Sequence, residues 1–540
     1  MRKPLIVASV GAAALITAVF YAAPFQGGLL ALAGLFPSGP VLYLEAKDFA
    51  ADLRDWNGSD VQRRWLSSAR YEGFSRSNLF LRLEAAWTEF SGAAGFVPDS
   101  ALVQSLAGGQ SALAIYDIGE LQFLYVTKIP NARVVQTALW QSRTKYETRR
   151  AGGIDFFVHV DSGRTVAFAA TGDYLILGTR EELVAGALRL LAGESLTPVR
   201  QEAWYADTTA AAGAPGDLRL AMNLEALVKS PQFRTYWIQR NVSEVRRYRA
   251  GIVDLVRSSG EIREERVFLR TAATPAVEGH AEALLRLAPD SAAFAHAWAN
   301  PTADQVTALV QQKILAPKVM PPTSEDFAPQ VDTPTDTGEE ADLETRIDET
   351  PLAAQSSPGF DELKRLLAAV PLVGVAQVQS GETLPDGVFV VTPTVLAIEA
   401  GRAWDLTEAR KALSPGRQWT GHQRGARTWY SLDGLSSLQF AVDGNLLLIA
   451  NSEQALGAML DRIDLRAGTT DTASVAVFRH LAARDDYRKM MRMLDHGQQR
   501  AFFSEDLWSL SGIFQQLREV EVRTRDGGTS LREMVSYRMR

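Results

Sequence analysis

The six histidines are the residues with the widest range of possible chemistry, because imidazole can bind a metal ion or exchange a proton near neutral pH. They are His159, His280, His296, His422, His480 and His496. Two zinc ligands on one element usually stand at close, regular spacing, as in H-x-H or H-E-x-x-H. Neither spacing occurs in the sequence. We therefore predict no metal site and no cofactor site.

Nucleophilic catalysis is not indicated either. The chain contains no cysteine, which excludes thiol nucleophiles, thiolate metal sites and disulfides. No G-x-S-x-G elbow, P-loop or strand-linked G-x-G-x-x-G is present, and Gly108-Gly109-Gln110-Ser111 is typical of a turn that leads into a strand. Asp161 and Asp433 recur at equivalent places, but each precedes a turn whose backbone its side chain can bind. We predict no catalytic residue.

A basic and aromatic segment, Phe233 to Arg257, interleaves six arginines with two tyrosines and a tryptophan. Such a mixture can bind single-stranded nucleic acid by stacking and phosphate neutralisation. The net charge of −7 and the pI near 5.6 argue against nucleic acid as a partner. We interpret the segment as a long amphipathic helix with a solvated basic face; contact with anionic lipid or an acidic partner is the alternative.

The N-terminus predicts a membrane anchor. Arg2 and Lys3 precede an apolar stretch whose first part, residues 5–23, is close to the roughly 20 residues that cross a bilayer. Basic residues on that side predict a cytoplasmic N-terminus and a periplasmic bulk, hence a single-pass inner-membrane protein of the cell envelope with the lipid bilayer as a partner. A cleaved signal peptide is the alternative. The second apolar piece, Leu29 to Phe36, should continue the helix or lie at the interface.

An internal repeat organises the rest of the chain. Residues 153–187 align without a gap on residues 425–459 at a constant offset of 272, so that Phe168 falls on Phe440. Short β-rich runs alternate with Asp, Gly and Asn turn residues. In each copy the pattern predicts three strands and a helix: strands near 154–160, 164–170 and 174–178 with a helix from about 180, and counterparts near 426–432, 436–442 and 446–450.

The repeat also predicts matched core positions and helix starts. Five apolar residues of copy one should occupy the places of five in copy two, namely Phe157, Val166, Phe168, Leu175 and Leu177 against Trp429, Leu438, Phe440, Leu447 and Ile449. Thr179 with Glu182 forms a capping-box pattern at the start of the helix, and Asn451 with Gln454 forms a weaker one.

The predicted fold class is α+β: an N-terminal transmembrane helix followed by two tandem copies of an antiparallel-sheet-plus-helix unit. We assign residues 1–36 to the cytoplasmic tip, anchor and juxtamembrane segment, 37–275 to the first repeat and 285–540 to the second. Residues 321–350 are acidic, Pro-broken and almost without aliphatic side chains. They predict a disordered insertion within the second repeat.

The layout resembles uncharacterised bacterial single-pass membrane proteins that are classified as domains of unknown function. The resemblance lies in the anchor, in Pro-Val-Leu-Tyr-Leu-Glu-Ala-Lys-Asp-Phe at 40–49, in the strand pair around 112–127 and in Gly-Asp-Tyr-Leu-Ile-Leu-Gly-Thr at 172–179. These motifs are structural. The resemblance therefore implies no activity and no site residue.

Two functions from different classes remain. The polar residues that recur between the copies are turn and cap formers, which favours a membrane-anchored envelope protein that binds or scaffolds a protein or peptide partner, and sheet edges are natural places to receive an extended segment. The alternative is an envelope hydrolase with an unrecognised active site, because catalytic groups need not be duplicated.

Overall fold

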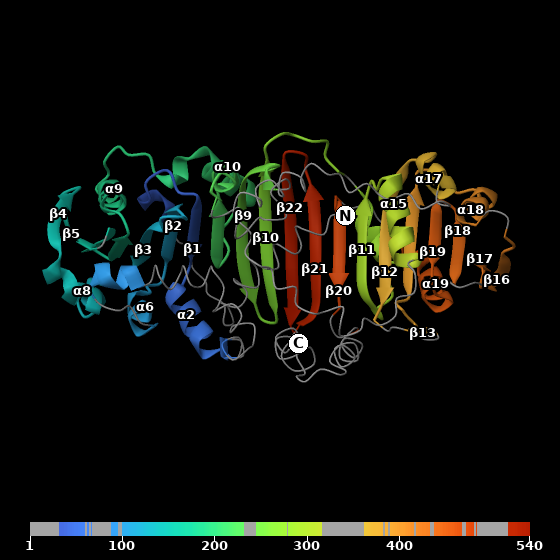
Figure 1. The fold of residues 1–540 in the computed structure, drawn as a ribbon, viewed down its shortest axis with the longest axis horizontal. Helices are drawn as coiled ribbons and strands as arrows, with labels where there is room; N and C mark the ends of the chain where they lie inside the picture. Colours follow the sequence, from blue (N-terminus) through green and yellow to red (C-terminus); the bar gives the residue numbers. More distant parts are fainter. Residues whose placement is uncertain are drawn as a thin grey trace, which may run out of the picture. The chain divides into compact units, whose positions relative to one another are not determined.

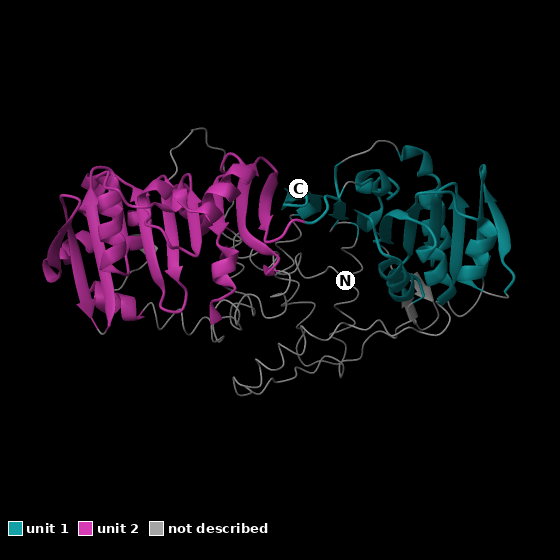
Figure 2. Ribbon diagram, turned by 90° about the horizontal axis from the view of Figure 1, so that it is seen from above, with its two compact units in different colours: residues 1, 274–540 teal, residues 2–273 magenta. Residues whose placement is uncertain are grey.

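The computed structural model divides the chain into two compact units, which we call the N-terminal unit (residues 2–273) and the C-terminal unit (residues 274–540) (Figure 2). The described residues are 32–59, 62–63, 66, 88–95, 100–161, 163–231, 245–277, 279–315, 361–381, 384–386, 389–414, 417–432, 437–466, 471–479, 482 and 517–539. The predicted repeat boundaries, 37–275 and 285–540, stay predictions. The acidic stretch 321–350 lies outside the described residues.

The predicted fold class is wrong. In place of a transmembrane helix followed by two tandem sheet-plus-helix copies, 20 strands belong to one antiparallel sheet. The sequence repeat identifies local hairpins, which depend on turns and alternation. It carries no signal for where a sheet stops, because any strand edge with free backbone groups can extend a ladder.

The N-terminal unit contributes ten strands to this sheet (Figure 1). Their order in space is β4-β5-β6-β7-β3-β2-β1-β8-β9-β10, with every neighbouring pair antiparallel. The bounds are β1 Leu42–Ala46, β2 Ser111–Asp117, β3 Gln122–Lys128, β4 Glu147–Ala151, β5 Ile154–Asp161, β6 Arg164–Thr171, β7 Tyr174–Gly178, β8 Leu218–Met222, β9 Tyr248–Ser258 and β10 Glu261–Arg270.

The C-terminal unit repeats this order strand for strand. Its ten strands run β16-β17-β18-β19-β15-β12-β11-β20-β21-β22, again antiparallel. Their bounds are β11 Ala292–Ala299, β12 Leu372–Ser380, β15 Thr394–Ala400, β16 Thr420–Arg424, β17 Arg427–Leu432, β18 Leu438–Asp443, β19 Leu446–Ala450, β20 Ser474–Phe478, β21 Leu517–Asp526 and β22 Ser530–Met539. A separate hairpin joins β13 Leu384–Asp386 to β14 Phe389–Val391.

Helices cover both faces of the sheet in each unit. In the N-terminal unit, Phe156 and Val158 of β5 join the core beneath one set of helices, whereas Phe157 between them packs into the other. One face carries η1 Leu32–Leu35, α9 Glu181–Leu191 and α10 Ala203–Ala212, and the other carries α6 Ser100–Leu106, α7 Asn131–Val134 and α8 Ala138–Ser142. α2 Phe49–Gly58 lies beside α6, and its Phe49 ring contacts Tyr125 of β3. Short turns η2 Arg143–Lys145, η3 Val199–Gln201 and α11 Leu224–Leu227 complete the unit.

The C-terminal unit has the same two-sided cover with fewer helices on one face. That face carries α14 Ala281–Leu285, α19 Glu453–Leu460 and the turn η7 Ile463–Leu465. The other carries α15 Ala303–Leu309, the π-helical turn η5 Val310–Ile314, α17 Asp361–Ala368 and α18 Leu406–Leu413. The predicted strand-strand-strand-helix order near 154–191 and 426–460 is thus confirmed in both units.

The apolar residues that follow the predicted anchor pack into protein. Leu32, Ala33 and Phe36 are almost fully buried in the core of the N-terminal unit, so this piece of Leu29–Phe36 neither continues a membrane helix nor lies at a lipid interface. Its apolar surface is satisfied by α9, η3 and the sheet.

The membrane predictions are corrected by the same structure. In the described part of the chain, no helix combines the length and the apolar composition that crossing a bilayer requires. The transmembrane helix, the signal anchor and the single-pass inner-membrane localisation with a periplasmic bulk are therefore wrong as predictions. Residues 5–23, on which they depended, lie outside the described residues.

One of the five matched core positions is also wrong. Phe157 lies opposite Phe168 in the β5–β6 ladder, but the residue opposite Phe440 is Tyr430, and Trp429 points to the other face. Ten residues separate Phe157 from Phe168, whereas nine separate Tyr430 from Phe440, so the register of the β17–β18 hairpin is shifted by one residue. Because side chains alternate between faces, a one-residue shift exchanges the two faces of the strand.

The basic segment does not form one long helix. Its C-terminal part, from Tyr248, lies in the 11-residue strand β9, while residues 232–244 lie outside the described residues. Successive side chains of β9 point to opposite faces of the sheet, and residues on both faces are buried. The predicted helix with one basic face does not describe this arrangement.

Candidate functional site

Two serine–histidine pairs are formed in the C-terminal unit, and the sequence analysis missed both. His422 Nε2 lies 2.8 Å from Ser431 Oγ, and His296 Nε2 lies 3.0 Å from Ser474 Oγ. Each pair joins diagonal neighbours on paired strands, β16 with β17 and β11 with β20. His422 and Ser431 meet through the register of one hairpin, and His296 and Ser474 meet through the pairing of strands 178 residues apart, so both contacts depend on strand register and not on a sequence motif.

These pairs lack the other parts of a hydrolytic centre. A catalytic histidine needs a group that orients its second nitrogen and donors that stabilise an oxyanion. Within the described part of the chain, no carboxylate bonds either ring. His422 stacks flat on Trp429 with ring centroids 4.1 Å apart, and His296 lies 4.5 Å from Trp298. Burial lowers the pKa of His296 to about 4, which makes it a weak base.

The remaining described histidines have structural surroundings. His159 Nδ1 bonds the carbonyl of Ala93 at 2.7 Å and its ring lies against Tyr146. His280 occupies the N-cap position of α14 without a capping side-chain bond. His480 and His496 lie outside the described residues. Over the described residues, no group of three His, Asp or Glu side chains has the geometry of a metal site.

The two recurring aspartates do not form a site. Asp161 ends β5 and is exposed. Asp433 lies outside the described residues. Gly108 lies against the β3 backbone: an added Cβ would meet the Lys128 carbonyl at 2.1 Å, so this turn before β2 requires glycine.

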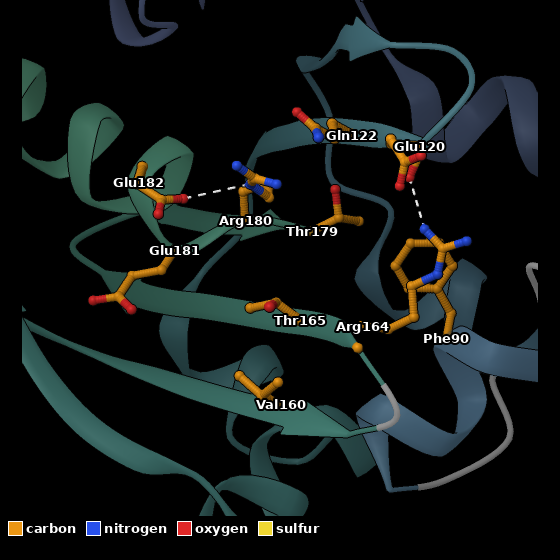
Figure 3. A pocket seen from close by; sticks show the side chains of 11 residues that line it. Phe90, Glu120, Gln122, Val160, Arg164, Thr165, Thr179, Arg180, Glu181 and Glu182 are labelled. Carbon is orange, nitrogen blue, oxygen red and sulfur yellow. Dashed lines mark hydrogen bonds and ion pairs between the residues drawn. The ribbon is translucent and has the colours of Figure 1, made fainter.

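A shallow polar hollow of about 210 Å³ opens in the N-terminal unit, beside the start of α9 (Figure 3). Its wall combines Phe90 and the 61% exposed Val160 with polar groups from β3, β6 and the β7–α9 connection. The polar lining residues are Glu120, Gln122, Arg164, Thr165, Thr179, Arg180, Glu181 and Glu182.

The charges around this hollow are already compensated. Arg164 bonds Glu89 at 2.7 Å and the Glu120 carbonyl at 2.8 Å, while its guanidinium lies over Phe90. Arg180 is 3.6 Å from Glu182, and Arg149 is 3.0 Å from Glu181. The hollow therefore offers no concentrated charge for a phosphate or a metal ion, and its small volume holds no large cofactor.

Thr179, at the back of the hollow, holds strands together and does not cap α9. Its hydroxyl accepts a bond from Phe123 N at 2.9 Å and donates to the Leu121 carbonyl. The N-cap of α9 is Arg180, without a side-chain cap bond. The predicted capping box is therefore wrong.

Asn451 acts in the same way in the C-terminal unit. It accepts from Thr394 N at 2.7 Å and donates to the Thr392 carbonyl, while Ser452 caps α19. The sequence match marked an equivalent position correctly but assigned it to the wrong element.

The free sheet edges are the remaining candidate surfaces. β4 pairs only with β5 among the described strands, and β16 pairs only with β17 (Figure 1). Both hairpins close with a two-residue turn, at Ala151 opposite Ile154 and at Arg424 opposite Arg427. In such a turn the closing pair is hydrogen-bonded, and hydrogen-bonded pairs then alternate with unbonded ones.

This alternation identifies the backbone groups that point outward. In β16 they belong to Gly421 and Gln423, and in β4 to Thr148 and Arg150. Gly421 and Gln423 are exposed and uncharged. Each edge therefore offers two residues whose N–H and C=O groups can pair with an added strand.

The two edges differ in charge. β4 carries Glu147, Arg149 and Arg150, of which Arg149 bonds both Glu147 and Glu181 and Arg150 bonds Asp155. Charged edges of this kind oppose strand addition. β16 has one charged residue, Arg424, and its guanidinium is held by both carboxylate oxygens of Asp461 at 2.9 and 2.6 Å.

Comparisons with known proteins do not assign the chain to a family. No protein-family model and no curated protein sequence matches the chain. Among solved structures, crystal forms I, III and IV of TP0453 are 12%, 11% and 10% identical, with TM-scores of 0.24, 0.26 and 0.24. They cover 46%, 46% and 44% of this chain and 82%, 83% and 79% of their own. Similarity at this level carries no argument, and the resemblance to uncharacterised single-pass membrane proteins stays a prediction.

Proposed function

We propose that this protein is a non-catalytic binding or scaffolding protein that receives an extended segment of a partner along the β16 edge of its C-terminal unit. The observation that carries the proposal is the outward-facing, uncharged backbone of Gly421 and Gln423 on a strand with one described neighbour. Strand addition obtains its affinity from such main-chain hydrogen bonds.

The surroundings of β16 suit an added strand. Gly421 has no side chain, and a Cβ placed there would lie 3.5 Å from the Tyr430 ring, in ordinary van der Waals contact. A side chain from an added strand beside Gly421 can therefore approach that ring. Since Arg424 is neutralised by Asp461, the edge exposes no uncompensated charge that would repel an uncharged segment.

Proline substitution at an outward-facing residue tests the proposal directly. Gln423→Pro removes one outward N–H and leaves the β16–β17 ladder intact, because the Gln423 N–H does not point to β17. The matched control is Thr148→Pro, which makes the same change on β4. Binding of the full-length protein to a panel of immobilised, uncharged, β-prone ten-residue peptides is measured for all three proteins.

We expect peptide binding by the wild type and by Thr148→Pro, and its loss in Gln423→Pro. Equal binding by all three proteins, or none by the wild type at concentrations at which it is monomeric, contradicts the proposal. Far-ultraviolet circular dichroism of each variant verifies that the sheets are retained.

A hydrolase is the second candidate, and the Ser431–His422 pair is the observation that favours it. An activated serine would react with a fluorophosphonate probe, and His422→Gln would abolish the labelling. We expect no labelling of Ser431, since it is buried and its histidine partner has no described carboxylate. Turnover of a peptide or ester substrate that Ser431→Ala removes would replace the binding function by this one.

A further inference from the structure

We propose that the occupant of the β16 edge is a second copy of this chain, which pairs its own β16 antiparallel to the first about a two-fold axis at His422. The inference rests on the proposed function, because it uses the same edge and names the partner. A two-fold contact of this kind closes on itself and yields a dimer.

The outward-facing residues fix the register. An antiparallel pair forms hydrogen-bonded partners only between residues whose backbone groups face each other. Gly421 of one copy then lies opposite Gln423 of the second copy, and Gln423 opposite Gly421. Only the two-fold axis at His422 engages both outward residues of both copies, and it forms four backbone hydrogen bonds.

The side chains are compatible with this register. His422 of one copy lies opposite His422 of the second copy, in a residue pair without backbone hydrogen bonds. Within each copy, the His422 ring is held against Trp429 and Ser431 on one face of the sheet. Thr420 lies opposite Arg424 of the second copy, so no two arginines or carboxylates face each other. The Gln423 side chain approaches Gly421 of the second copy, where no side chain obstructs it.

The β4 edge does not permit the same contact. Its outward residues are Thr148 and Arg150, so the equivalent axis passes through Arg149 and places two Arg149 guanidinium groups directly opposite each other. Like charges directly opposite destabilise a strand pair. Pairing of β4 with β16 of another copy would be head-to-tail, and each added copy would expose a further edge. Self-complementarity is therefore a property of β16.

A single introduced cysteine reports the contact, because the chain has no other thiol. Cα atoms of an unbonded antiparallel pair lie about 4.5 Å apart, within the roughly 4.4–6.8 Å of disulfides. We expect His422→Cys to form a disulfide-linked dimer under mild oxidation, at low protein concentration, at least about ten times faster than Arg149→Cys, the equivalent position of the β4 edge. Equal rates for the two variants would overturn the inference.

Sedimentation equilibrium of the cysteine-free protein provides the second measurement. We expect a concentration-dependent dimer that Gln423→Pro weakens by about tenfold or more and that Thr148→Pro leaves unchanged. His422→Lys supplies a variant with an unaltered backbone: its two ammonium groups would face each other and weaken the dimer, whereas His422→Gln would not.

The outcomes separate this inference from the function on which it rests. A protein that is monomeric at all concentrations but still binds the peptide panel through β16 overturns self-pairing and keeps the binding function. A monomer that binds no peptide overturns both. A dimer that survives both Gln423→Pro and His422→Lys uses another surface and also overturns self-pairing.

Discussion

The two units share one strand order but fill equivalent places with different chemistry. β7 and β19 align at the offset of 272, and tracing the ladders outward from them places Arg219 of β8 at the position of Val475 in β20. Arg219 forms a buried ion pair with Asp254, at 2.7 and 2.8 Å, with both side chains 4% exposed. The C-terminal unit has an aliphatic residue at the same point of the ladder.

The helices that follow the first strand of each unit, α2 and α15, also have a charged residue in one unit where the other has an aliphatic one. Asp48 caps α2 and Thr302 caps α15, so the fourth residue after each cap is Asp52 in one unit and Val306 in the other. Both are buried. Asp52 forms an ion pair with Arg257 of β9, whereas Val306 packs among aliphatic side chains.

On β9 and β21 the exchange is reversed: the N-terminal unit has the aliphatic residue and the C-terminal unit has the charged one. Ile252, fully buried against the core beneath α10, corresponds to Glu521 of β21. The connection between α19 and β20 is about half as long as that between α9 and β8, which contains α10. Glu521 is itself only 7% exposed, and its carboxylate pairs with Arg523 and Arg538. The two units thus share the backbone ladder, whereas buried positions exchange aliphatic for charged side chains, and each of these buried charges is paired.

The largest expected effect comes from breaking the Arg219–Asp254 pair. Arg219→Met leaves the Asp254 carboxylate buried without its cation, which we expect to destabilise the N-terminal unit by about 3–5 kcal/mol. Hydrogen exchange read separately on β8–β9 and on β20–β21 should show lost protection in the first pair of strands only.

A double variant makes that comparison more specific. Arg219→Met with Asp254→Asn removes the buried charge and retains an acceptor for Gly216 N, which Asp254 holds at 3.1 Å. Most of the lost protection should return, because the penalty belongs to the orphaned charge and an aliphatic side chain is tolerated at the Val475 position. Equal loss in the single and double variants would assign the effect to packing.

The second effect is the pH dependence that Asp52 gives the N-terminal unit. His296 of the C-terminal unit, whose pKa burial lowers to about 4, contributes with the opposite sign, so the effect of Asp52 is measured as a difference between a variant and the wild type. Burial raises the pKa of Asp52 from 3.8 to about 6, against the opposing influence of Arg257. The folded protein therefore binds a proton more readily than the unfolded chain between about pH 4 and pH 6. The resulting stabilisation, up to about 3 kcal/mol, is complete below that window and is lost as the pH rises through it.

Asp52→Asn isolates this contribution. In urea unfolding at pH 4.5, 5.5 and 6.5, the stability of the wild type relative to that of Asp52→Asn should fall as the pH rises. Asp461→Asn, an exposed partner of Arg424, is the matched control and should leave the pH profile unchanged. Parallel profiles for the wild type and Asp52→Asn would contradict the raised pKa.

Local structure was predictable from the sequence because hairpins depend on adjacent residues. Alternation with Gly, Asp and Asn turns located the strands and helices near 154–191 and 426–460. Sheet extent was not predictable, since it depends on pairing between distant segments. Tyr430, and not Trp429, occupies the place of Phe157 for a similar reason. The chain from Tyr430 to Phe440 is one residue shorter than the chain from Phe157 to Phe168, and a gap-free match conceals that shift.

The candidate site was only partly predictable. A sheet edge as a receiving surface was expected, but which strand ends the sheet, and which of its residues face outward, follow from the ladder and its two-residue turn. The buried pairs of β8 and α2 were also missed, because Arg219 and Asp52 are identical in type to solvated surface residues and only their burial distinguishes them.

The smallest expected effect tests whether Thr179 and Asn451, which occupy equivalent positions in the two units, cap a helix or connect neighbouring strands. If Thr179 and Asn451 were helix caps, as their sequence patterns suggested, Thr179→Val and Asn451→Ala would cause the first turns of α9 and α19 to fray. The observed bonds instead connect them to Phe123 N and Thr394 N at the starts of β3 and β15. Each substitution should therefore lower the free energy of unfolding by about 1–2 kcal/mol and increase hydrogen exchange at those two strand amides.

Ser452→Ala, which removes the actual cap of α19, should fray that helix and leave Thr394 N protected. Fraying of α9 in Thr179→Val with an unchanged Phe123 amide would restore the capping role.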